Sequence, residues 1–328
     1  MRWIQVTIFL IAILSSGCSK KSQTIDKILN PTIPHLIHVR YNEGSSGSES
    51  CAKCHEEIYN EWASSFHAQA AVSESFKNET NHYEFKRCIT CHAPLAPASG
   101  SSRPQARTWK IEEGITCSSC HVVGDRTAGP IESSAPHGTL KDPTFADSKI
   151  CSSCHEPTYE QWKKSHYAKE GQTCQSCHMP EKIRFLSNMT PTLYRKKKSH
   201  DHGFKINFEN VVDLKISTSR LVPDQIVLEV TNLGAGHSLP TGIYGDATLF
   251  VDLRIFDGDE VVFFREEKLS ARDGNSIEAG DKRRFFYSFR PPGLKSYLIV
   301  ARVHFASSNY EHDQKLAEVQ RYYYDSKR

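Results

Sequence analysis

The C-terminal part of the chain, residues 205–328, shows the short apolar runs that are typical of β strands. Apolar residues alternate with polar ones, or follow one another, in four segments: 212–216, 226–230, 249–255 and 297–303. Asp257-Gly258 follows the third segment, and Asp-Gly is a frequent hairpin turn. Six or seven such strands in about 120 residues predict an all-β, immunoglobulin-like sandwich.

Residues 1–18 have the pattern of an export signal. An apolar run extends from Trp3 to Leu14, and small residues lead up to Cys18. About a dozen apolar residues are too few to span a bilayer, which takes roughly 20. The ending Gly17-Cys18 resembles the lipobox of bacterial lipoproteins, whose cysteine is acylated. We expect an exported protein, periplasmic or at the cell surface, anchored to the membrane through Cys18; secretion without an anchor is the alternative.

The segments between these two ends differ in composition. Residues 19–50 are rich in Ser, Pro, Gly and Asn and show no sustained helical period, so we expect a linker. In residues 51–204 the apolar positions are sparse and irregular, which is unlike an ordinary hydrophobic core. The predicted organisation is therefore multidomain: signal segment, linker, a mostly α-helical or irregular domain at 51–204, and the β sandwich at 205–328.

Charge and cysteine content narrow the function. The 328 residues contain 41 Lys and Arg against 38 Asp and Glu, a formal net charge of +3, which gives no electrostatic case for nucleic acid as a partner. The unusual numbers are 11 cysteines and 16 histidines. Ten of the cysteines lie between Cys51 and Cys177, and none follows Cys177. The chemistry of the protein is therefore expected within residues 51–204.

The ten cysteines form five pairs, and a histidine follows each pair directly. C-x-x-C-H is the attachment motif of c-type haem, because two thiols bond the porphyrin vinyl groups and the histidine becomes the proximal iron ligand. Zinc sites and disulfides also use C-x-x-C, but neither requires a histidine after every pair. The sequence therefore predicts five covalently attached haem c groups. The predicted attachment residues are Cys51, Cys54, His55; Cys88, Cys91, His92; Cys117, Cys120, His121; Cys151, Cys154, His155; and Cys174, Cys177, His178.

Five porphyrins would also explain the sparse apolar pattern of residues 51–204. They supply a large apolar surface that side chains and neighbouring haems can cover. We therefore predict that the apoprotein of this domain does not fold.

The sixth ligand of each iron separates an electron carrier from an enzyme. Eleven histidines remain beyond the five in the motifs, whereas Met179 and Met189 are the only methionines beyond the signal segment. Bis-histidine ligation is thus possible at every site. Such iron is coordinatively saturated, which suits electron transfer and leaves no position for a substrate.

An internal repeat indicates two of these distal ligands. Residues 51–68 and 151–168 share Cys-x-x-Cys-His-Glu, a Tyr, a Trp and a Ser, and each copy ends in a histidine, His67 or His166. If the segment after the motif is helical, His67 lies about 18 Å along the axis from His55 and cannot reach the iron that His55 holds. We expect both histidines to ligate a neighbouring haem; a surface histidine is the alternative.

Taken in order, the motifs resemble those of the bacterial multihaem cytochromes c related to cytochrome c-554. The first and fourth motifs read C-x-x-C-H with a following W, S and H; C-x-x-C-H-x-P begins at Cys88, E-G-I-T-C-S-S-C-H at Glu113 and C-Q-S-C-H-M-P at Cys174. The segment G-H-S-L-P-T-G at 236–242 is similar to one in members with an appended β domain. The resemblance implies closely stacked haems, an exported redox protein, and His237 as a distal ligand. A structural histidine in a turn is the alternative for His237.

Other histidines are candidates by position. His137 lies in a predicted loop between the third and fourth motifs, where a ligand is needed. His200 and His202 follow the fifth motif, and the His-x-Phe pattern of the family favours His202. His82 is a further possibility. We expect ordinary surface histidines at His35, His38, His304 and His312.

The leading functional hypothesis is electron transfer between redox partner proteins through closely spaced bis-histidine haems. The alternative is an oxidoreductase that acts on a small nitrogen or sulfur compound at one five-coordinate haem. The pentahaem nitrite reductases usually have Lys in place of one motif histidine, whereas all five motifs here end in His, which weighs against this enzyme. In a third reading, the β domain binds a partner or a surface polymer to which the haems deliver electrons.

Overall fold

A computed structural model describes most of the chain beyond the N-terminal segment. The described residues are 47–95, 104–123, 126–131, 137, 139–188, 195–218, 222, 224–242, 245–290, 296–308 and 310–324. The predicted signal segment 1–18, its Cys18 and nearly all of the linker 19–50 lie outside them. Among the described residues, no helix has the length and apolar content that a membrane-spanning segment requires.

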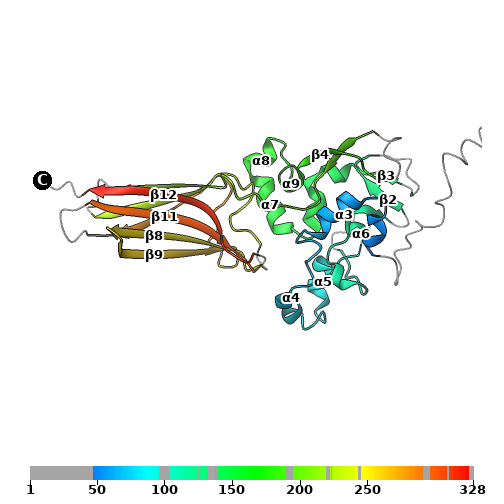
Figure 1. The fold of residues 1–328 in the computed structure, drawn as a ribbon, viewed down its shortest axis with the longest axis horizontal. Coiled ribbons are helices and arrows are strands. Elements are labelled where there is room, and N and C mark those ends of the chain that lie inside the picture. The colour runs from blue at the N-terminus through cyan, green and yellow to red at the C-terminus, as the bar shows by residue number, and fades with distance from the viewer. Residues whose placement is uncertain are drawn as a thin grey trace, which may run out of the picture.

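The chain forms two regions that lie end to end, a helical one and a β domain (Figure 1). Short helices joined by turns build the first region, and the last strand, β12 (Gln314–Tyr324), ends at the far end of the second (Figure 1). The helices are α2 (Glu49–Ala52), α3 (Glu56–Ala63), α4 (Glu74–Glu79), α5 (Lys86–His92), α6 (Cys117–His121), α7 (Glu156–Lys164), α8 (His166–Lys169) and α9 (Cys174–His178), with 3₁₀ turns η1 (Ile111–Glu113), η2 (Pro143–Ala146) and η3 (Ser148–Ser153).

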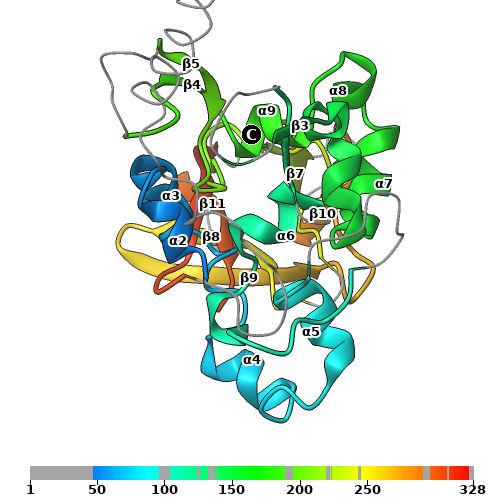
Figure 2. The same ribbon diagram turned by 90° about the vertical axis from the view of Figure 1, so that its right-hand side faces the viewer.

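Two small sheets complete the helical region. Strands β1 (Val122–Val123), β2 (Arg126–Gly129) and β3 (Thr139–Lys141) form one, in which β2 and β3 are parallel. Strands β4 (Glu181–Arg184) and β5 (Lys197–His200) form an antiparallel ribbon directly after α9. In Figure 2 the helices surround the middle of this region rather than packing into one bundle.

The two regions have very different apolar cores. Three buried residues, Ala71, Ile89 and Ala93, form the apolar cluster of the described helical region. The β domain has a cluster of twenty-two buried residues. A region of this size needs a larger apolar interior to be stable, so the helical region matches the expectation that cofactors form part of its core.

The β domain is a sandwich of two antiparallel sheets. One has the strand order β10-β7-β6 and the other β12-β11-β8-β9. The strands are β6 (Val212–Thr218), β7 (Gln225–Asn232), β8 (Thr248–Asp257), β9 (Glu260–Ser270), β10 (Lys282–Ser288), β11 (Ser296–Ala306) and β12 (Gln314–Tyr324). Seven strands in this order form an immunoglobulin-like sandwich in which the fourth strand, β9, lies on the four-stranded sheet. The predicted fold class is confirmed.

Side-chain alternation explains why the sheets pack together. In β7, Ile226, Leu228 and Val230 are buried while their neighbours are half-exposed. The hairpin between β8 and β9 turns at Gly258, whose φ of +62° is the conformation that glycine adopts without strain. The sequence predicted both this turn and the inward face.

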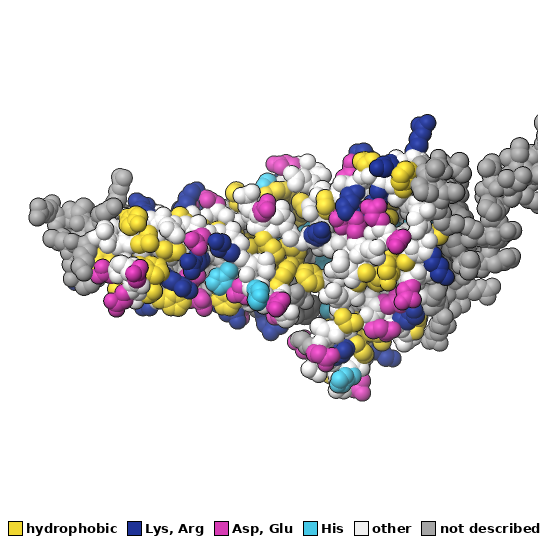
Figure 3. All heavy atoms as spheres, viewed as in Figure 1, with side chains coloured by type: hydrophobic (Ala, Val, Ile, Leu, Met, Phe, Trp, Pro, Cys, Tyr) yellow, Lys and Arg dark blue, Asp and Glu magenta, His cyan; other side chains and the backbone are white. Residues whose placement is uncertain are grey.

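The β domain contacts the helical region through side chains of both. The Phe66 and Tyr310 rings meet edge to face with 5.3 Å between centroids. The Tyr167 hydroxyl donates a hydrogen bond of 2.7 Å to the Leu233 carbonyl oxygen. Over the face shown in Figure 3, basic and acidic side chains are interspersed, consistent with the small net charge.

Candidate haem-binding sites

Each C-x-x-C-H motif occupies about one helical turn. The second, third and fifth motifs lie in α5, α6 and α9, and the first and fourth lead directly into α3 and α7. In those two, the histidine N–H donates to the carbonyl of the first cysteine at 2.9 Å, as for His55 and Cys51. Residues three and four apart share one side of a helical turn. The two thiols and the imidazole of a motif therefore face the same way, as attachment of one porphyrin requires.

Four of the five motif histidines face a second histidine from a distant part of the chain. The ring centroids are 6.1 Å apart for His55–His137, His67–His155 and His121–His202, and 6.3 Å apart for His178–His237. An imidazole nitrogen lies about 1.1 Å from its centroid and binds a first-row metal at about 2 Å, so two imidazoles on opposite sides of one iron have centroids about 6 Å apart. The four pairs fit bis-histidine ligation.

Hydrogen bonds at Nδ1 orient these imidazoles. The Nδ1–H of His121 donates to the Ala128 carbonyl at 2.8 Å, that of His202 to the His200 carbonyl at 2.8 Å, and that of His237 to the Ser238 carbonyl at 3.0 Å. His55 makes the same kind of bond to the Leu186 carbonyl. A proton on Nδ1 leaves the lone pair on Nε2 free, and this is the usual arrangement of a metal-binding histidine.

Burial favours the neutral form of five of the paired imidazoles. It lowers the pKa of His67 and of His202 to about 4, and it also lowers the pKa of His121, His155 and His237. The neutral imidazole is the form that binds a metal.

The second motif differs from the other four. The His92 ring stacks on Phe76 with 4.2 Å between centroids, and its Nδ1–H donates to the Ala70 carbonyl at 2.6 Å. Within the described ranges, no second histidine ring lies opposite His92. One of the five predicted sites is thus built differently.

His166, predicted as a distal ligand, does not face any motif histidine. Its ring lies 4.0 Å from that of Tyr167, and its Nδ1 is close to Gly280 of the β domain. The two copies of the repeat differ in what packs against them: His67 meets His155 of the second copy, whereas His166 lies beside Gly280 of the β domain. His166 therefore drops out of the ligand set that we propose.

The remaining candidate histidines are also judged by whether their rings face a motif histidine. The structure places His202, and not His200, opposite His121; His200 donates from Nδ1 to the Met179 carbonyl at 2.6 Å. His82 is exposed. His304 stacks on Phe250 in the β domain, His312 precedes β12, and His35 and His38 lie outside the described residues.

Thiols of different motifs lie next to one another. Side-chain hydrogen bonds join Cys51 with Cys117, Cys91 with Cys154, and Cys151 with Cys174. These sulfur atoms stand for the thioether sulfurs of attached haem, which cannot titrate. Their proximity places the attachment edges of neighbouring sites side by side.

A buried arginine that no sequence pattern singled out joins the second and third motifs. Arg107 is 4% exposed. Its guanidinium donates to the carbonyls of Pro94 at 3.2 Å, Trp109 at 3.0 Å, Lys110 at 2.8 Å and Gly114 at 2.8 Å, and to the Thr116 hydroxyl at 3.3 Å. Pro94 follows His92, and Thr116 precedes Cys117. Arg107 therefore fixes one haem-binding motif relative to the next.

Gly114 allows a close approach that a side chain would prevent. Its φ is +60°, and a Cβ there would lie 2.4 Å from the carbonyl oxygen of His67. The Ile115 N–H donates to this carbonyl at 2.9 Å. The segment before the third motif thus supports the backbone of His67, which faces the histidine of the fourth.

Comparisons with known proteins agree with this geometry. Residues 50–122 match the family described as cytochrome c554 and c-prime. No match was found among curated protein sequences. A penta-heme cytochrome c552 from Thermochromatium tepidum is 16% identical, and the similarity covers 85% of this chain and 99% of that one with a TM-score of 0.59. The putative ApaA protein from Bordetella pertussis is 15% identical over 33% of this chain and 89% of its own, with a TM-score of 0.20, too low to indicate a common fold.

The family match spans the first three motifs, and the similarity in fold extends over both regions. Together with the C-x-x-C-H motifs, these findings support a multihaem c-type cytochrome whose haem-binding region is followed by a domain of antiparallel β sheets.

Proposed function

We propose that the protein is an exported pentahaem c-type cytochrome that passes electrons between redox partner proteins. The observation that carries the proposal is the set of four facing histidine pairs, with 6.1–6.3 Å between ring centroids. An iron held between two imidazoles is coordinatively saturated, which suits electron transfer rather than binding of a substrate.

The residues divide into attachment, proximal and distal groups. The five cysteine pairs attach haem c, and the five motif histidines are its proximal ligands. The distal ligands are His137 opposite His55, His202 opposite His121, His67 opposite His155, and His237 opposite His178. Haem c, when bound, supplies one-electron chemistry between ferric and ferrous iron. Nδ1 hydrogen bonds to backbone carbonyls fix the orientation of the imidazoles of His55, His121, His202 and His237.

The contacts between motifs support a continuous path for electrons. Thiol contacts connect the first site with the third, the second with the fourth, and the fourth with the fifth. Cys120 of the third motif lies close to Cys151 and Cys154 of the fourth. All five sites therefore belong to one connected set.

Location and anchoring rest on the sequence of residues 1–18. The apolar run and the lipobox-like ending support export and a lipid anchor at Cys18. Export also suits the chemistry, because haem c is proposed at all five motifs. Labelling with a radioactive or alkyne-tagged fatty acid tests the anchor: Cys18→Ser should abolish incorporation, and unchanged incorporation contradicts it.

The site at His92 favours a second candidate function. Its imidazole is packed against Phe76, whereas each of the other four motif histidines faces a histidine. The iron proposed there would bind a small exogenous ligand, as an oxidoreductase acting on a nitrogen or sulfur compound requires.

Protein-film voltammetry of the fully haem-loaded protein separates the two functions. For an electron carrier we expect reversible one-electron waves that integrate to five electrons per molecule and are unchanged by nitrite, hydroxylamine or sulfite. A catalytic current with one of these compounds would move the second candidate ahead of the first.

A further inference from the structure

The repeat in this chain is a unit of two motifs. G-x-T-C-x-S-C-H occurs at 114–121 and again at 171–178, so each copy of the first half is followed by a copy of this second half. In both, the threonine caps the motif helix and exchanges hydrogen bonds with the serine three residues on. The first unit combines the first and third motifs, and the second unit combines the fourth and fifth.

A tryptophan in each unit holds the start of the second motif. Trp62 donates from Nε1 to the Ile115 carbonyl at 2.7 Å, and Trp162 donates to the Gln172 carbonyl at 3.2 Å. Both carbonyls lie two residues before the first cysteine of the second motif. Both tryptophans lie seven residues after the histidine of the first motif, on α3 and α7. The same contact therefore occurs twice.

The residue before each tryptophan holds the other side of the same haem site. Glu61 accepts a hydrogen bond from the His202 N–H at 3.0 Å. Gln161, at the equivalent position, accepts from the Ser238 N–H at 3.2 Å and from the Thr241 hydroxyl at 2.9 Å. Ser238 directly follows His237. His202 and His237 are the histidines that face the second motif of each unit.

We propose that Glu61-Trp62 and Gln161-Trp162 are positioning pairs, each of which fixes the proximal motif and the distal ligand of the neighbouring haem. We further propose that the acid in one pair and the amide in the other give these two haems different reduction potentials. The inference rests on the proposed haem ligation and goes beyond it, because neither pair contacts iron.

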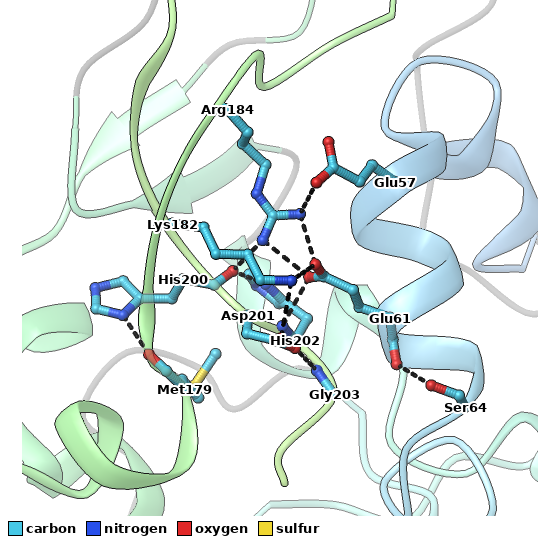
Figure 4. Close-up of polar contacts among 10 residues, drawn as sticks. All are labelled: Glu57, Glu61, Ser64, Met179, Lys182, Arg184, His200, Asp201, His202 and Gly203. Atoms are coloured by element: carbon cyan, nitrogen blue, oxygen red, sulfur yellow. Dashed lines mark hydrogen bonds and ion pairs between the residues drawn. The ribbon is translucent and has the colours of Figure 1, made fainter.

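The surroundings of Glu61 show that it acts as a charge. Figure 4 shows it together with Lys182 and Arg184 from β4, and with Asp201 beside His202. Its Oε1 lies 2.9 Å from Nη1 of Arg184, and Lys182 lies 2.9 Å from Asp201. Glu61 thus forms ion pairs with both Lys182 and Arg184, as expected of a carboxylate that carries its charge.

Arg184 completes the support of His202. Its guanidinium donates at 3.0 Å to the His200 carbonyl, the oxygen that also accepts the Nδ1–H of His202 (Figure 4). Glu61 and Arg184 thus hold the backbone on both sides of the ligand. The two cations have two buried carboxylate partners, Glu61 and Asp201, and an exposed one, Glu57, so loss of the Glu61 charge makes the buried surroundings of the ligand more positive.

Exchange of the acid and the amide tests the proposal. Glu61→Gln and Gln161→Glu are nearly isosteric and keep a carbonyl-type acceptor for the backbone N–H. At pH 7.5, Glu61→Gln should raise the reduction equilibrium constant of the haem at His121 by about tenfold, which is 59 mV for a one-electron couple. Gln161→Glu should shift the haem at His178 in the opposite direction.

A matched control comes from the same helix. Glu57 also lies 3.3 Å from Arg184, but its side chain is 62% exposed and it has no hydrogen bond to the ligand loop. Glu57→Gln removes the same charge and should shift the same haem by less than twofold, because solvent screens an exposed charge. Trp62→Phe keeps an aromatic ring but removes the Nε1–H donor to the Ile115 carbonyl. This variant should change the electron paramagnetic resonance (EPR) g-values of the haem at His121 alone.

The reduction waves of the haems at His121 and His178 are assigned with the variants His202→Met and His237→Met, respectively. Each variant should raise the potential of its own haem, because an iron with Met and His ligands has a higher potential than one with two His ligands. Equal shifts in Glu57→Gln and Glu61→Gln, or no shift in either exchange variant, would refute the positioning pairs while the ligation stands. Unchanged potentials in both methionine variants would instead refute the proposed ligation.

Discussion

Replacement of Arg107 tests whether a single buried side chain holds two haem-binding motifs together. Arg107→Met keeps an unbranched side chain of similar length and removes all five hydrogen-bond donors. The Pro94 carbonyl keeps a hydrogen bond from the Ser119 hydroxyl, and the Thr116 hydroxyl keeps one with that of Ser118, whereas the buried Gly114 carbonyl loses the Arg107 donor. Leaving that carbonyl unsatisfied costs about 1–3 kcal/mol and each of the other lost hydrogen bonds about 0.5–1.5 kcal/mol, so we expect a destabilisation of about 3–5 kcal/mol.

The assay is thermal unfolding of the haem-loaded protein, followed by circular dichroism in the haem absorption band. A change of 1 kcal/mol shifts Tm by about 2–4 °C for a region of this size, so Arg107→Met should melt roughly 10 °C lower. Scans are compared at one heating rate, because unfolding of such proteins is often irreversible. Arg107→Lys should lie in between, since lysine keeps the charge and three donors but not the planar fork.

The control is Arg87→Met, which alters an exposed arginine of α5. Surface substitutions of this kind change stability by less than about 0.5 kcal/mol. A melting temperature of Arg107→Met within about 2 °C of the wild type, or an equal loss in Arg87→Met, would show that the reasoning about Arg107 is wrong.

Three further predictions concern ligation, folding and pH. His237→Ala should convert one haem to the high-spin form and increase carbon monoxide binding by one molecule per protein; unchanged stoichiometry would count against His237 as a ligand. Protein produced without haem attachment should keep the cooperative melt of the β domain and lose the helix signal of residues 51–204, and native-like helix content would contradict this. Burial raises the pKa of Asp246, but hydrogen bonds from Ser308 and Ser307 outweigh burial and lower it. The Asp246 carboxylate therefore stabilises the fold above its unfolded pKa of about 3.9. This contribution is lost as the pH falls through the lower pKa of the folded protein. Asp246→Asn should therefore destabilise the β domain at pH 7 by less than about 1 kcal/mol, since the Asp246 side chain is exposed. Denaturation curves of the wild type and the variant should converge as the pH falls below about 4. A difference in stability that does not change with pH would contradict the role given to the Asp246 charge.

The inward faces of the β domain were predictable because a buried strand face leaves a period of two in the sequence. Such a face appears in β6, β7, β8 and β11. The segment that forms β9 was not among the four apolar segments singled out, although the hairpin turn at Asp257-Gly258 implies a strand after it. Its apolar residues Val261 to Phe264 follow one another instead of alternating with polar ones, and Glu260 to Lys268 are exposed or half-exposed, so this edge strand shows no buried face with a period of two over that stretch.

The motif residues were predictable from spacing, whereas their partners depend on tertiary structure. A helix that continues from the first motif would have included His67, but α3 ends at Ala63. The Ser65 hydroxyl, beyond the end of α3, accepts a hydrogen bond from the Ala68 N–H. His67 nevertheless faces another motif, as expected from its distance to His55. His166 carries the same local pattern, and only the β domain that follows it makes its surroundings different.

One sequence signal for the positioning pairs was present and was not used. The second half of the repeat, G-x-T-C-x-S-C-H, occurs twice, and it would have shown that each unit contains two motifs. Glu61 and Gln161 occupy equivalent positions in these units. Their contacts with His202 and Ser238 join residues far apart in the chain, which no local pattern reveals.

The central claim is that at least four haem irons lie between two imidazoles. Low-temperature EPR of the fully haem-loaded, oxidised protein tests it most directly, because bis-histidine ferric iron is low-spin and five-coordinate ferric iron is high-spin. We predict low-spin signals from at least four of the five haems, those at His55, His121, His155 and His178. Five low-spin haems would remove the second candidate function and leave the claim intact, whereas fewer than four low-spin haems would contradict it.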